Sequence, residues 1–102
     1  SHGGAATQAT NNSTTVTLNR ICGKITMFGT LADNAEAQFQ VNNTAVEADD
    51  VVILSLANNA TNRMELVAYK VLAGSFSVRV KNNGTGGLTP IINFAIIKAV
   101  AA

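Results

Sequence analysis

The feature that most constrains the fold is a series of short segments in which polar and apolar residues alternate. Residues 75–81 are the clearest case, because Phe76, Val78 and Val80 are separated by Ser77 and Arg79. Successive side chains of a β-strand point to opposite faces, so a period of two predicts a strand with one buried face. Clusters of Asn, Gly and Asp, which favour turns, separate these segments.

The same pattern predicts six or seven short strands and no substantial helix. They cover residues 14–21, 24–28, 37–43, 51–56, 64–72, 75–81 and 91–100. Residues 64–72 fit a helix or a strand by periodicity alone, and their Val and Tyr content favours a strand. Short strands joined by turns predict an all-β fold, either an antiparallel β-sandwich or a jelly-roll-like barrel.

The chain of 102 residues is expected to form one folded domain that is preceded by a short N-terminal arm. Residues 1–13 are rich in Gly, Ala, Thr and Asn and show no periodicity, which predicts a flexible N-terminal arm. Residues 1–4 within this arm are interpreted as the remnant of an expression tag. The β-sandwich domain is expected to cover residues 14–102.

Two of the expected strands are apolar on both faces. Residues 51–56, with the sequence VVILSL, are therefore expected to form a central strand that is covered twice. The terminal strand, residues 91–100, needs either an internal position in its sheet or a partner chain. The side chains of this strand that are expected to contact a second chain are Ile91, Ile92, Phe94, Ile96 and Ile97.

Charged residues make up only 13% of the chain, about half the usual share of about 25%, and the formal net charge is +1. Charge is depleted where subunits meet, so the composition favours a homo-oligomer. A nearly neutral chain also excludes a basic nucleic-acid-binding surface. No apolar run approaches the roughly 18 residues of a membrane-spanning helix, so membrane insertion is not expected.

Residues that could carry catalysis are scarce. His2 is the only histidine, and Cys22, the only cysteine, is expected to be a small buried core residue. Glu47, Asp49 and Asp50 could ligate Ca²⁺, but they do not match the twelve-residue calcium loop, and a solvated loop is the simpler interpretation. Accordingly, the sequence predicts no enzyme, no catalytic residue, no metal site and no cofactor.

Three segments resemble a family of small virion domains of tailed bacteriophages. They are residues 15–27 (TVTLNRICGKITM), 73–76 (AGSF) and 93–100 (NFAIIKAV), and the resemblance extends over residues 7–101. The resemblance implies a trimeric all-β module located in the virion, on a tail fibre, a spike, a needle tip or the capsid surface. It implies no catalytic residues.

From this resemblance we expect a non-enzymatic, homotrimeric virion structural protein, with two roles left open. In a tail-fibre or spike module, exposed loops would contact the host surface or its glycans. The loop residues expected to make these contacts are Asn58, Asn59, Asn62, Asn82 and Asn83. In a capsid decoration or cement protein, residues 5–13 would instead dock on other virion proteins.

The alternative from a different class is a soluble carbohydrate-binding β-sandwich. In that case a glycan would lie on an exposed strand face, where Gln38, Gln40, Asn42 and Arg79 would contact it.

Overall fold

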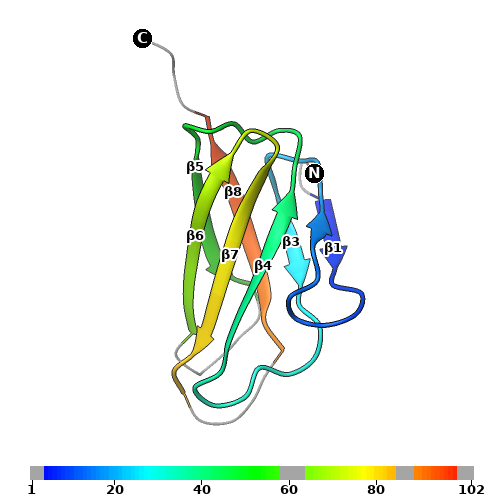
Figure 1. Cartoon of the computed structure of the whole chain (residues 1–102), viewed down its shortest axis with the longest axis vertical. Helices are drawn as coiled ribbons and strands as arrows, with labels where there is room; N and C mark the ends of the chain where they lie inside the picture. Colours follow the sequence, from blue (N-terminus) through cyan, green and yellow to red (C-terminus); the bar gives the residue numbers. More distant parts are fainter. Residues whose placement is uncertain (1–3, 58–63, 85–88, 99–102) are drawn as a thin grey trace.

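The computed structural model describes residues 4–57, 64–84 and 89–98. These residues form eight strands and no helix (Figure 1). The strands are β1 (Gly4–Thr7), β2 (Val16–Thr17), β3 (Cys22–Thr26), β4 (Glu36–Asn42), β5 (Val51–Leu56), β6 (Met64–Leu72), β7 (Ser75–Asn82) and β8 (Ile91–Ile97). The all-β class is therefore confirmed, with at least one strand more than expected.

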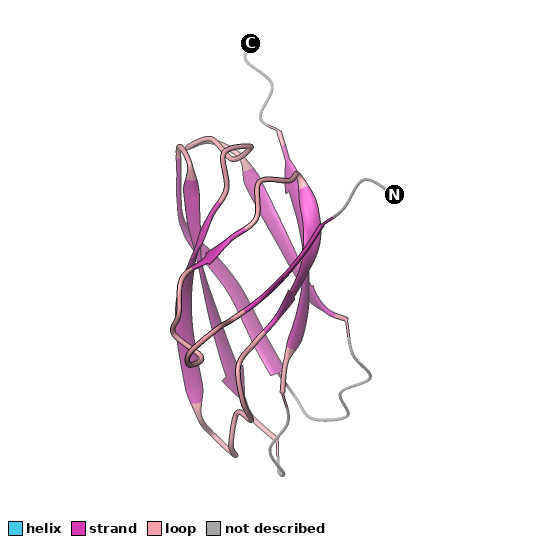
Figure 2. Cartoon of the chain, turned by 90° about the vertical axis from the view of Figure 1, so that its right-hand side faces the viewer, coloured by secondary structure: helices cyan, strands magenta, loops and turns pink. Residues whose placement is uncertain are grey.

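The strands form two four-stranded sheets that face each other (Figure 2). Sheet A has the order β1-β3-β8-β5, and sheet B has the order β2-β4-β7-β6. Both sheets are mixed, because β1 pairs parallel to β3 and β2 pairs parallel to β4. The other pairings are antiparallel. The two-layer arrangement is compatible with the expected sandwich, but the expectation of purely antiparallel sheets is wrong for the two N-terminal strands.

The core lies between the sheets and is filled by the inward side chains of every second strand residue. Phe76, Val78 and Val80 of β7 are fully buried, as their alternation predicts. Phe76 of sheet B and Phe94 of sheet A meet with ring centroids 5.6 Å apart and planes inclined by 56°. A tilted aromatic pair of this kind adds to the burial energy and couples the two sheets.

Strand β8 has the internal position that its apolar sequence requires, since it pairs with β3 on one side and β5 on the other. The expectation of a central position for residues 51–56 is wrong. Among the strands that the structure describes, β5 pairs only with β8 and lies at the edge of its sheet, and its outward residues Val51 and Ile53 are 54% and 49% exposed. A segment that is apolar on both faces is thus covered by its own chain on one face only.

The expectation of a flexible arm over residues 1–13 is wrong for residues 4–8. Residues 4–7 form β1, so Gly4, which the sequence assigns to the tag remnant, belongs to the fold and pairs with Gly23. The Gln8 side chain is buried, with 2% exposure. The Gln8 amide donates to Thr14 O at 3.1 Å, and its Oε1 accepts from the Phe28 N–H at 2.9 Å. Glycine, alanine and threonine give no periodic signal, and backbone pairing with β3 holds this segment in place.

The edge strand β6, next to β5 across the sandwich, is irregular. Its register against β7 shifts between Tyr69 and Leu72, and Lys70 there has a φ of 53°. A bulge twists an edge strand and disturbs its pairing groups, and a lysine at the same place discourages strand addition from another chain. The free edge of sheet B at β6 is therefore protected.

Candidate functional site

The outward face of sheet B is polar and charged. Glu36 of β4 lies opposite Lys81 of β7, which in turn lies opposite Glu65 of β6. At the next outward position, two residues further along β4, Gln38 lies opposite Arg79. Such alternating charges on exposed strands are typical of a face that stays in contact with water.

The residues of the carbohydrate hypothesis lie on this face. Gln38, Gln40 and Asn42 follow one another at every second position of β4, with Arg79 beside Gln38. The Tyr69 hydroxyl donates to Gln38 Oε1 at 2.9 Å, and Gln40 Nε2 donates to Asn42 Oδ1 at 2.7 Å. Tyr69 thus joins this polar row, although it comes from another strand.

The outward face of sheet A is nearly free of charge. Its register places twelve residues there, of which only Lys24 is charged. They are Ala5 and Thr7 of β1, Cys22, Lys24 and Thr26 of β3, Ile91, Asn93, Ala95 and Ile97 of β8, and Val51, Ile53 and Ser55 of β5. Isolated exposed apolar residues are ordinary, but a contiguous apolar patch marks an interaction surface.

On one half of this face, three large apolar side chains project into solvent. We call these side chains, Val51, Ile53 and Ile97, the ridge. Val51 and Ile97 lie directly opposite each other on β5 and β8, and Ile53 lies opposite Ala95. Val51, Ile53 and Ile97 are 54%, 49% and 51% exposed. Their inward neighbours Val52 and Leu54 pack against the core, so the ridge side chains have no place inside their own chain.

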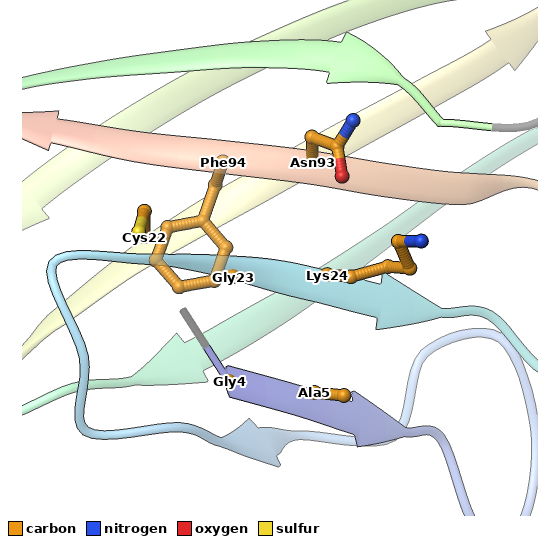
Figure 3. Close-up of a pocket in the computed structure, with 7 residues that line it drawn as sticks. All are labelled: Gly4, Ala5, Cys22, Gly23, Lys24, Asn93 and Phe94. Atoms are coloured by element: carbon orange, nitrogen blue, oxygen red, sulfur yellow. The ribbon is translucent and has the colours of Figure 1, made fainter. Parts of the chain in front are cut away.

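The other half of the face contains a hollow of about 630 Å³ between β1, β3 and β8 (Figure 3). The paired glycines Gly4 and Gly23 line it with backbone only. Its other lining residues are Ala5, Cys22, Lys24, Asn93 and Phe94.

On the inner side, the space beside the two glycines is already filled. A Cβ at Gly23 would lie 2.7 Å from Leu18 Cδ2 and 2.9 Å from Gly4 O. The hollow therefore opens on the outer face, next to the ridge.

Only two of the five expected interface residues point outward. Ile97 is exposed and Ile91 is half-buried, both on the outer face of sheet A. Ile92, Phe94 and Ile96 belong to the core of their own chain, with exposures of 0%, 2% and 7%. The expectation of a partner-chain contact is therefore corrected for these three side chains, because the facing sheet of the same chain covers them.

Of the five expected loop contacts, the described residues contradict one, Asn82. Asn58, Asn59 and Asn62 lie outside them. Asn82 is fully buried, and its side chain donates to Leu31 O at 3.0 Å and accepts from the Gly84 N–H at 2.9 Å. The half-buried Asn83 donates to Glu65 Oε2 at 2.5 Å. Asn82 thus holds the turn together and cannot serve as an exposed contact.

The acidic connection between β4 and β5 is closed by a lysine. Lys98 Nζ lies 2.6 Å from the buried Asp50 Oδ2 and 3.3 Å from Glu47 Oε2. The hydrogen bond to Asp50 is the main cause of a raised pKa of Lys98. Among the described residues, no group of three His, Cys, Asp or Glu side chains is placed to hold a metal ion. The connection therefore fastens the end of β8 to the start of β5.

Sequence reasoning missed Val51, Ile53 and Cys22 as parts of a surface. Cys22 was expected in the core, but it is half-buried and lines the outer hollow. The available signal was the absence of charge in residues 51–56, together with an apolar side chain at every outward position but one.

Comparison of the chain with protein-family models, with curated proteins and with solved structures found no match. No helix long and apolar enough to cross a membrane occurs in the described part of the chain.

Proposed function

We propose that the chain is a non-enzymatic structural protein of a tailed-bacteriophage virion, which assembles as a homotrimer and is exposed on the particle. The observation that carries the proposal is the contrast between the two outer faces. Sheet A presents one charge among twelve outward residues, whereas sheet B presents Glu36, Lys81 and Glu65 side by side in one row and Arg79 in the next. This contrast supports a module that buries one face against other copies and keeps the other in water.

The virion setting and the three-fold symmetry come from the resemblance of residues 15–27, 73–76 and 93–100 to phage virion domains. The same resemblance is the basis for a location on the tail or the capsid. A cement role that depends on a free arm at residues 5–13 loses support, because residues 5–7 pair with β3 and Gln8 is buried.

The proposal is tested by labelling of intact particles. Antibodies raised against the purified protein, followed by gold labelling and electron microscopy of phage particles whose genome encodes it, are expected to decorate the virion. Gold restricted to tail tips supports host attachment, and gold spread over the capsid supports decoration. Purified particles that contain no such chain by mass spectrometry would contradict the proposal.

A second candidate is a carbohydrate-binding module that uses the outer face of sheet B. It is favoured by the polar row of Gln38, Gln40, Asn42 and Arg79, and by the bond from Tyr69 to Gln38. Planar amide and guanidinium groups with one aromatic ring can hydrogen-bond and stack on a sugar. Binding on a glycan array that is lost in Arg79→Ala and Gln38→Ala supports this function, and an array without hits contradicts it.

A further inference from the structure

We propose that the ridge of one copy packs into the hollow of a neighbouring copy, so that the outer face of sheet A contains both halves of the contact between chains. The inference rests on the proposed homo-oligomer and names its contact surface. The ridge is formed by Val51, Ile53 and Ile97, and the hollow lies over Gly4 and Gly23.

The two halves cannot meet within one chain. Ile53 lies opposite Ala95, and Ala95 lies opposite Cys22 at the hollow, so ridge and hollow are two strands apart. Neighbouring strands are about 4.8 Å apart, which separates Ile53 from Cys22 by roughly 10 Å across a continuous hydrogen-bonded sheet. Any ridge side chain that enters the hollow must therefore come from another molecule.

The hollow offers space to apolar side chains. The hollow has a volume of about 630 Å³ and is open to solvent on the outer face of sheet A. Ala5 and Cys22, which line it from outward positions of β1 and β3, have small side chains that leave this space open. The three ridge side chains stand about half exposed on the same face and are the groups that this space can take.

The low charge of this face fits a second copy better than a strongly charged partner. Within the twelve outward residues of sheet A, the single charge of Lys24 offers little attraction to a strongly acidic or basic partner. Another copy brings an equally neutral face, and apolar contact with few charges is typical of obligate interfaces.

The sequence of β5 supports a covered position. β5 contains no charge, proline or glycine, and all six residues keep a continuous register with β8. Proteins usually protect exposed edge strands with such residues or with a bulge, as β6 does here at Lys70. The absence of these devices in β5 is explained when the strand lies beside a neighbouring copy.

Ridge and hollow are different patches, so each copy offers one of each. A contact between unlike patches closes into a ring when the rotation between copies fits. Three copies then give the proposed trimer, in which each ridge fills the hollow of the next copy.

The contact is tested by cross-linking the variant Ile53→Cys to the native Cys22 with copper phenanthroline as oxidant. Within one chain the two positions are roughly 10 Å apart, beyond the about 7 Å between Cα atoms that a disulfide can span. Any disulfide between them must therefore join two molecules. The matched control is Val67→Cys, which places a thiol at a partly exposed apolar position on the outer face of sheet B.

The expected result for Ile53→Cys is a covalent trimer on a non-reducing gel, with a peptide pair joining positions 53 and 22 in mass spectrometry. A covalent dimer with the same peptide pair supports the contact and overturns the three-fold symmetry. Monomer only, or equal cross-linking by Val67→Cys, overturns the contact itself.

Two charged variants give a second measurement that needs no cross-link. Ile53→Lys would bring its charge against Lys24 in the neighbouring hollow, whereas Ile53→Glu would meet Lys24 with the opposite charge. We expect the dissociation constant to rise at least tenfold more in Ile53→Lys than in Ile53→Glu. Equal effects of the two charges would show that residue 53 does not face this hollow and would overturn the inference.

Discussion

Gln8 tests whether the N-terminal segment is part of the fold. The variant Gln8→Ala removes two side-chain hydrogen bonds, one to Thr14 O and one from the Phe28 N–H. Each contributes about 1 kcal/mol net, and the lost buried methylene contributes about 0.8 kcal/mol more. With 2% exposure of the Gln8 side chain, little water can replace these partners. The expected loss in the free energy of unfolding is about 3 kcal/mol.

Urea denaturation followed by far-UV circular dichroism measures this loss. The variant Gln8→Glu keeps the acceptor oxygen but cannot donate to Thr14 O while ionised. Burial raises the pKa of such a carboxyl in the folded protein above its value in the unfolded chain. The folded variant is therefore more stable at low pH, where the carboxyl is protonated, and loses this stability as the pH rises. The deficit of Gln8→Glu relative to wild type is therefore expected to shrink between about pH 7 and about pH 4. A loss below about 0.5 kcal/mol in Gln8→Ala, the range of ordinary surface substitutions, would refute the reasoning.

Three further outcomes are expected. In Lys98→Met, the deficit in urea midpoint should be present at about pH 8 and shrink as the pH rises above 10.5, the ordinary pKa of lysine. The hydrogen bond to Asp50 raises the pKa of Lys98, and the stability linked to this shift is lost as the lysine deprotonates; a pH-independent deficit would contradict this. Gly23→Ala should cost about 1–3 kcal/mol in urea denaturation, since its Cβ would lie 2.9 Å from Gly4 O, and Leu18→Ala should restore only part of the loss. Lys70→Gly should raise the thermal midpoint, because the φ of 53° at Lys70 costs a side-chain residue about 1–2 kcal/mol; a lower midpoint would argue against a strained bulge.

Much of the strand content could be predicted from alternation. Residues 37–43 and 75–81 alternate without interruption and correspond closely to β4 and β7. The expected strands leave a gap at residues 22–23, but Gly23 lies inside β3, where Leu18 occupies the space that a larger side chain would need. A pattern of side-chain polarity contains no information on such a close approach, nor on a backbone-paired strand like β1.

The candidate site was only partly predictable for a related reason. An apolar run such as residues 51–56 indicates that both faces avoid water, but it does not tell which face the chain covers itself. The structure assigns Val52 and Leu54 to the core and leaves Val51 and Ile53 outside. The opposite case is Asn82. An Asn-rich turn predicts an exposed side chain, but the Asn82 amide is buried and donates to Leu31 O. Strand position and tertiary contacts decide both cases.

The central claim is that copies of the chain associate through the outer face of sheet A, and the mass in solution tests it most directly. Sedimentation equilibrium of the wild-type protein at about 1 to 100 μM covers the range of micromolar association. We expect a mass near three times 10.6 kDa, which falls toward one chain in Ile53→Lys and is unchanged in Val67→Lys on sheet B. A wild-type protein that sediments as a single chain of 10.6 kDa throughout this range would contradict the claim.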